Sequence, residues 1–183
     1  KRSYQSFITE KYIRMSGMKK TFENTNDAKK ALEEVKPLTA GKYDGTDYEF
    51  KHRAHTRSIN GSVTYIVNDK REPHQDVVLY IHGGAWFQDP LDNHFDFIDQ
   101  LAGELDARVI MPVYPKVPHR DYRTTFELLK NIYQKEILEV ENPQHMTIMG
   151  DSAGGQIALS FAQYLKKETP LPQPGHIVML SPV

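Results

Sequence analysis

The stretch that most constrains the fold is Gly150–Gly155, in which a serine stands between two glycines. The apolar run Met146–Met149 before it predicts a short buried strand, and the run Gln156–Ala162 after it predicts a helix. A turn this tight strains the backbone of Ser152, and side chains two residues before or after it would collide with their surroundings, so glycine suits both places. The sequence therefore predicts a strand–turn–helix unit that raises a serine hydroxyl at the carboxyl end of a strand.

The spacing is the G-x-S-x-G pattern, which is typical of a nucleophile elbow. Ser152 is then a candidate nucleophile, and the partial positive charge at the helix amino terminus behind it favours a developing anion. The alternative is a glycine-rich turn without chemistry, because the bare pattern also occurs by chance. The context favours the nucleophile, since a strand precedes the pattern, a helix follows it and a second glycine motif lies upstream.

This second motif is His82-Gly83-Gly84-Ala85-Trp86, which directly follows the apolar run Val77–Ile81. Its two glycines let the backbone approach a substrate closely and turn its amides inward. Acyl transfer needs such donors because the tetrahedral intermediate carries an oxyanion, and each donor is typically worth about 3–4 kcal/mol of barrier. The alternative is a plain glycine turn leaving a strand. Two motifs that both follow strands, in this order, disfavour it.

Composition excludes several classes of protein. The 183 residues suffice for one domain with a core, and a net charge of −1 gives no reason to expect nucleic acid or an acidic membrane as partner. The absence of cysteine excludes disulfides, cysteine catalysis and thiolate metal sites. No apolar run has the length of an integral membrane segment. No signal peptide is visible, so we expect a cytoplasmic location, although the start at Lys1 leaves the upstream sequence open.

The amino-terminal region predicts two helices before the sheet. Apolar residues recur at helical spacing from about Ser3 to Asn24. A second, shorter helix follows the candidate capping residues Thr25–Asp27 and must end before Pro37. We interpret residues 1–40 as a helical cap or arm, which either packs as an amphipathic arm or covers an active site.

The rest of the chain predicts a sheet. Asn60-Gly61 joins Glu49–Ile59 and Ser62–Val67 as an antiparallel hairpin. Strands then alternate with helices. The strands are expected at Val77–Ile81, Arg108–Val113, Met146–Met149 and His176–Leu180, and the helices around Phe95–Leu105, over Tyr122–Val140 and from the elbow to about Lys167. This pattern predicts an α/β fold with a mostly parallel sheet and helices on both faces, and such sheets bind ligands at the carboxyl ends of their strands.

On both motifs together, the chain resembles the α/β-hydrolase superfamily, and most of all its hormone-sensitive-lipase-like esterases. Gly150–Gly155 matches the elbow of that family residue for residue. His82–Ala85 matches its H-G-G-G motif except for the final alanine, a variant also seen in formamidase-like relatives. Tyr114 and Pro118 match the ends of its Y-R-L-A-P sequence. The resemblance implies that residues 41–183 are the amino-terminal portion of an α/β-hydrolase core.

The resemblance also implies roles. Ser152 would be the nucleophile, and the Ala153 amide would donate to the oxyanion. The amides of Gly84 and Ala85 would complete the oxyanion hole, with Gly83 shaping the loop.

Five further residues belong to the motifs or the pocket that the resemblance implies. Trp86 and Phe87 would line the acyl or alcohol pocket, although ordinary packing at the mouth of the sheet is an equal alternative. His82 would hold the oxyanion loop, Asp151 belongs to the elbow motif, and Tyr114 belongs to the stretch that matches Y-R-L-A-P. No metal and no organic cofactor is required.

A serine nucleophile needs a general base and an orienting acid, which follow it in this superfamily in the order acid, then histidine. The only such residues after Ser152 are Glu168 and His176. His176 opens a strand, so it belongs at the amino edge of the sheet, roughly 20 Å from the elbow. The same argument excludes His145. The remaining histidines have no motif and are expected in surface or core roles: His52, His55, His74, His94 and His119.

We therefore expect the triad acid and histidine to lie outside this chain. The apolar strand His176–Leu180 would leave an open edge, which proteins in solution avoid. The hypothesis is that the sheet is truncated after its sixth strand and that the chain is the amino-terminal part of a longer hydrolase.

The expected function is a serine carboxylesterase that cleaves small to medium acyl esters through an acyl-enzyme at Ser152. An amidase or formamidase with the same site is the enzymatic alternative. A catalytically silent binding protein is the other, because the chain lacks a triad base. The expected partner is a small-molecule ester, and the missing carboxyl-terminal part or a second copy of the chain stays open as a further partner.

Overall fold

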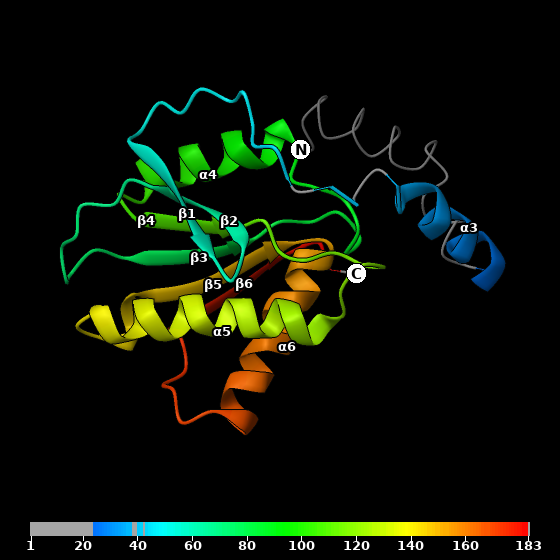
Figure 1. Ribbon diagram of the computed structural model, residues 1–183. Helices are drawn as coiled ribbons and strands as arrows, with labels where there is room; N and C mark the ends of the chain where they lie inside the picture. Colours follow the sequence, from blue (N-terminus) through cyan, green and yellow to red (C-terminus); the bar gives the residue numbers. More distant parts are fainter. Residues whose placement is uncertain (1–23, 38–39, 42, 183) are drawn as a thin grey trace, which may run out of the picture.

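The computed structural model describes residues 24–37, 40–41 and 43–182, and its centre is a six-stranded sheet (Figure 1). The strands lie in the order β1-β2-β4-β3-β5-β6. The pairings among β4, β3, β5 and β6 are parallel, whereas β1 pairs with β2 and β2 with β4 in antiparallel fashion. Their bounds are Ala54–Ile59 (β1), Ser62–Val67 (β2), Val77–Ile81 (β3), Arg108–Pro112 (β4), Met146–Asp151 (β5) and His176–Leu180 (β6).

Helices cover both faces of this sheet, with α4 on one side and α5 and α6 on the other (Figure 1). Successive residues of a strand point to opposite faces. Leu79 of β3 therefore packs with α5 and α6, while Val78 and Tyr80 pack with α4. The bounds are Asp92–Glu104 (α4), Tyr122–Glu139 (α5) and Ala153–Glu168 (α6), with a short 3₁₀ turn, η1, at Pro143–His145. The predicted mostly parallel α/β architecture is confirmed.

The first strand is shorter than predicted, because β1 begins at Ala54 rather than at Glu49. The amides of Lys51 and His52 donate to the Asp99 carboxylate on α4, at 2.8 and 3.1 Å. A backbone that binds a helix side chain cannot also join a sheet ladder. The alternating pattern before Ala54 thus reflects packing of this segment against α4 and not strand pairing.

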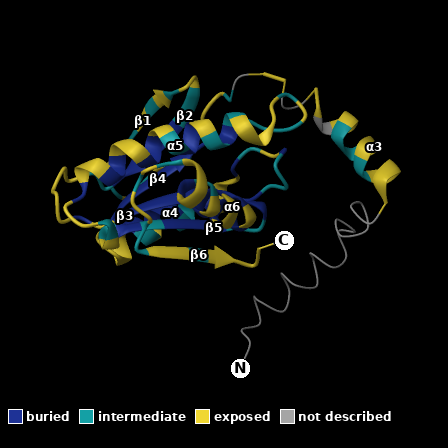
Figure 2. Cartoon of the chain, turned by 90° about the horizontal axis from the view of Figure 1, so that it is seen from below, coloured by how far each residue is buried: buried dark blue, intermediate teal, exposed yellow. Residues whose placement is uncertain are grey.

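The helix α3 spans Thr25–Val35 and ends before Pro37 as predicted. Its capping residue is Asn24 and not one of Thr25–Asp27, because the Asn24 side chain accepts a hydrogen bond from the Asn26 amide at 2.8 Å. α3 stands apart from the sheet in both views (Figures 1 and 2). The helix predicted over residues 3–24 lies almost wholly outside the described residues, and the cap over residues 1–40 stays a prediction.

The strand β6 forms one edge of the sheet, where Figure 2 shows it exposed beside the buried β5. Within residues 43–182, β6 pairs only with β5. Ile177 and Met179 are each 40% exposed although they are apolar. The open apolar edge expected from the sequence is therefore present in the described structure.

Candidate active site

The turn between β5 and α6 places Ser152 in a strained conformation. Its φ of 50° and ψ of −122° lie outside the regions that residues with side chains normally adopt. The Ser152 amide donates to the Leu180 carbonyl of β6 at 2.9 Å, and the Ser152 carbonyl accepts from the Gly155 amide at 3.0 Å. These bonds hold the serine between the end of the strand and the first turn of α6.

Glycine is sterically required on both sides of Ser152. A Cβ atom at Gly150 would lie 2.3 Å from the Gly154 carbonyl oxygen, and one at Gly154 would lie 2.0 Å from the Ile81 carbonyl oxygen. Both neighbours are backbone atoms, so neither can turn away. These are the collisions with helix and neighbouring strand that the G-x-S-x-G spacing led us to expect.

The loop after β3 passes close to this turn and is itself unusual. Gly84, Ala85 and Trp86 have φ values of 119°, 52° and 69°, so three successive residues adopt left-handed backbone. The Gly84 carbonyl accepts from the amides of Phe87 and Gln88, at 3.0 and 2.9 Å. Strained backbone of this kind persists only where its surroundings fix it, and it clusters at functional sites.

His82 is one of the groups that fix this loop. Its buried ring stacks on Tyr114 with centroids 4.3 Å apart, and the Tyr114 hydroxyl donates to the His82 carbonyl at 3.0 Å. The His82 Nδ1 lies 2.6 Å from the Gly83 carbonyl oxygen, which can only accept, so Nδ1 carries the proton. Burial lowers the pKa of His82 to about 3, and the ring is therefore neutral at neutral pH.

This buried histidine predicts a pH-dependent stability. Below about pH 6.5 the histidine of the unfolded chain is protonated, whereas His82 in the folded protein stays neutral down to about pH 3. The free energy of unfolding should therefore fall by about 1.4 kcal/mol for each pH unit in this range. Urea unfolding at a series of pH values measures this slope. His82→Asn, whose amide can still donate to the Gly83 carbonyl, should show a shallower slope in the same range. An unchanged slope in the variant would contradict the claim that buried, neutral His82 causes this loss of stability.

Asp151 joins the serine turn to the loop after β3. Its Oδ1 accepts from the Tyr80 hydroxyl at 2.6 Å and from the Gly83 amide at 2.8 Å. Its Oδ2 lies 3.5 Å from Nε2 of His94. Burial disfavours the charged form, but hydrogen bonds from His94 and Tyr80 outweigh it and hold the pKa of Asp151 below its usual value.

Tyr80 and His94 were not predicted as site residues. Tyr80 is one of five buried residues in β3, and nothing in an apolar run distinguishes a residue whose hydroxyl reaches the sheet edge. His94 was expected to have an ordinary surface or core role; it lies in the first turn of α4, a position that carries no motif.

The pocket residues proposed from the sequence differ in exposure. Phe87 is only 7% exposed, which favours packing over substrate contact. Trp86 is half-buried, and its ring meets Tyr114 edge-on with centroids 6.2 Å apart. Of these two, Trp86 alone can still present a face to a bound molecule.

The histidines excluded on sequence grounds lie far from the serine. His176 is level with Thr147 in the sheet register, at the opposite end of β5 from Ser152. His145 pairs with Asp76 at that same amino edge, at 2.6 Å. Among the residues that the structure describes, no side chain is hydrogen-bonded to the Ser152 hydroxyl.

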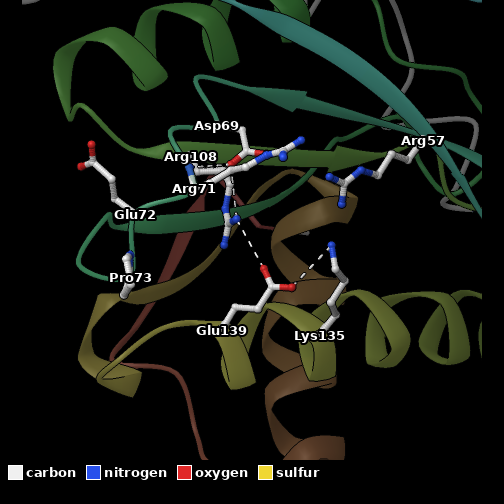
Figure 3. A pocket seen from close by; sticks show the side chains of 8 residues that line it. All are labelled: Arg57, Asp69, Arg71, Glu72, Pro73, Arg108, Lys135 and Glu139. Atoms are coloured by element: carbon white, nitrogen blue, oxygen red, sulfur yellow. Dashed lines mark hydrogen bonds and ion pairs between the residues drawn. The ribbon is translucent and has the colours of Figure 1, made fainter.

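A charged hollow lies at the amino edge of the sheet, where Figure 3 shows Arg108 and Lys135 pointing toward Glu139. Arg108 also pairs with the buried Glu136 at 2.6 Å. Parallel sheets bind their ligands at the carboxyl edge, so this hollow is not the continuation of the serine site. Within the described residues, no group of three histidine, cysteine, aspartate or glutamate side chains could hold a metal ion, and no helix is long and apolar enough to cross a membrane.

Comparison with known families identifies the fold. The family model for the alpha/beta hydrolase fold matches residues 78–183, which include both glycine motifs. The chain belongs to the α/β-hydrolase family.

Curated relatives are hydrolases. An esterase of Acinetobacter venetianus is 30% identical over 106 residues, which are 58% of this chain and 35% of the relative. An ethyl acetate hydrolase of Pseudomonas putida is 28% identical over 168 residues, 86% of this chain and 52% of the relative. The chain thus spans between about a third and about half the length of these two relatives.

Solved structures of esterases are similar to this chain in fold. A candidate esterase from Staphylococcus aureus has a TM-score of 0.75 and 26% identity over 88% of this chain and 54% of its own. An esterase of the bacterial hormone-sensitive lipase family has a TM-score of 0.61 at 19% identity over 87% of this chain and 58% of its own, which supports the fold alone.

Proposed function

We propose that this protein is a serine carboxylic-ester hydrolase, with Ser152 as its nucleophile. The observation that carries the proposal is the left-handed serine between two sterically required glycines, at the carboxyl end of β5 and the amino terminus of α6. Such a turn exposes the hydroxyl above the sheet while the backbone behind it supplies amide donors.

The oxyanion hole in this proposal consists of the Ala153 amide and the amides of Gly84 and Ala85. The Gly83 amide is already committed to Asp151 at 2.8 Å, so it shapes the loop and does not bind the substrate. In the part of the chain that the structure describes, the amides of Gly84 and Ala85 donate to no other residue. Two unused donors in a rigid turn are what a developing oxyanion needs.

The reaction would proceed by acyl transfer. The Ser152 oxygen attacks the ester carbonyl carbon, its proton passes to a general base, and collapse of the tetrahedral intermediate expels the alcohol. Water then attacks the acyl-enzyme and releases the acid. Because no histidine among the described residues is hydrogen-bonded to Ser152, we expect the general base and its orienting acid to come from residues other than 43–182.

The substrates are expected to be esters with small to medium acyl groups, in line with the name of the ethyl acetate hydrolase above. The test is a panel of p-nitrophenyl acetate, butyrate and octanoate against aryl formamides and anilides, assayed with the longer hydrolase that supplies the general base, because residues 1–183 alone are expected to be inactive. Turnover of acetate and butyrate well above the formamides is the expected result. Faster turnover of formamides would favour the amidase alternative, and no turnover of any compound would favour a silent binding protein.

A further inference from the structure

The Asp151 carboxylate accepts a hydrogen bond from the Gly83 amide and so joins the serine turn to the Gly83–Trp86 loop. It lies directly before Ser152, so its position is tied to that of the nucleophile. The fit is close, because a Cβ atom at Gly83 would lie 2.4 Å from Oδ2 of Asp151. Rotation of this carboxylate would break its hydrogen bond to the Gly83 amide, which directly precedes the two free amides.

Two side chains hold the carboxylate in its rotamer. The Tyr80 hydroxyl donates to Oδ1, the same oxygen that binds the Gly83 amide. Oδ2 faces His94, a residue that is 7% exposed and whose ring lies 5.7 Å, centroid to centroid, from the ring of His82. Each oxygen of Asp151 thus has its own partner.

The orientation of His94 follows from its other contact. The Leu91 amide donates to Nδ1 of His94 at 2.9 Å, so Nδ1 is an acceptor and carries no proton. The remaining ring proton of the neutral form is then on Nε2, the atom that faces Oδ2 of Asp151 at 3.5 Å. The first turn of α4 therefore aims an N–H group at the carboxylate.

We propose that His94 is a positioning residue for acyl transfer: from the first turn of α4 its Nε2–H fixes the Asp151 carboxylate, which in turn fixes the oxyanion loop against Ser152. The proposal rests on the function proposed above, since the loop matters only if it binds an oxyanion. His94 does not touch the reacting atoms in this account. His94 acts through Asp151. Loss of the His94 side chain should therefore loosen the oxyanion loop without removing any of the amides that would bind the oxyanion.

Two substitutions separate this role from simple helix capping. His94→Asn keeps an acceptor for the Leu91 amide but is too short to reach Asp151. His94→Gln places an amide N–H near the Nε2 position but loses the capping acceptor. His145→Gln is the matched control, because it disrupts a histidine–aspartate pair at the opposite edge of the sheet.

The first measurement is the rate at which a fluorophosphonate labels Ser152, because phosphonylation also passes through a charged oxygen in the oxyanion hole. His94→Asn should slow labelling about tenfold or more, because a misplacement of about 1 Å in the reacting geometry can cost about a hundredfold in rate. His94→Gln and His145→Gln should label within about threefold of the wild type. Slow labelling in His94→Gln with normal labelling in His94→Asn, or equal rates in both, would overturn the proposal.

The second measurement is the proton chemical shift of the Gly83 amide, recorded by nitrogen-15 NMR, which requires no catalysis. It should move in His94→Asn and stay near its wild-type position in His94→Gln. If the wild type does not label at all, the proposed function fails, and this shift still decides whether His94 positions the loop. If the wild type labels and the Gly83 shift is the same in all variants, the proposed function stands and the role of His94 is wrong.

Discussion

Gly154→Ala is expected to destabilise the folded protein by at least about 3 kcal/mol. The new methyl group would lie 2.0 Å from the Ile81 carbonyl oxygen and 2.7 Å from that of His82. Both oxygens belong to the backbone at the end of β3, so relief requires α6 to move away from the centre of the sheet. The free energy of unfolding in urea measures the effect, and ester hydrolysis should be lost with it.

The matched control is Gly155→Ala, one residue further along the same helix. Its Cβ would lie 3.1 Å from the Gly150 carbonyl oxygen and 3.3 Å from Cβ of Pro182, a fit that small shifts can relieve. Alanine also has the better helix propensity, by about 1 kcal/mol. We expect its stability to stay within about 1 kcal/mol of the wild type. Equal losses in the two variants would contradict the steric account of the elbow.

Ser152→Ala should lower ester hydrolysis by about 10⁴-fold or more, because covalent catalysis has no second nucleophile to replace the lost hydroxyl. Stability should change little, since alanine leaves the backbone of the turn unaltered. The comparison is the kcat for p-nitrophenyl butyrate, with Ser160→Ala as control on the exposed face of α6. A variant that retains more than about a tenth of the wild-type rate would rule out Ser152 as the nucleophile.

The sequence was sufficient for the parts of this fold that depend on local pattern. The apolar runs at Val77–Ile81 and Arg108–Pro112 are buried strands in the structure, and the Asn60-Gly61 hairpin joins β1 and β2 as predicted. The elbow was predictable for a different reason. Its backbone leaves no space for a Cβ at Gly150 or Gly154, so only glycine fits there. The two glycines in the sequence are therefore enough to indicate the turn.

The contacts around Asp151 were beyond such reasoning because they join residues far apart in the chain. Tyr80 and His94 reach the same carboxylate from β3 and from α4, and neither residue type nor local spacing signals the meeting. The start of β1 was mispredicted for a related reason. The amides of Lys51 and His52 donate to the Asp99 side chain, which lies 48 and 47 residues further along the chain. This contact prevents the strand pairing that the local sequence favours.

The measurement that tests the account most directly is the site of covalent modification by a fluorophosphonate. Peptide mapping by mass spectrometry of the labelled protein should find one adduct, on Ser152, and Ser152→Ala should carry none. An adduct on another residue with Ser152 unmodified, or no adduct in a protein that hydrolyses esters, would contradict the claim that the serine of this strained turn is the nucleophile.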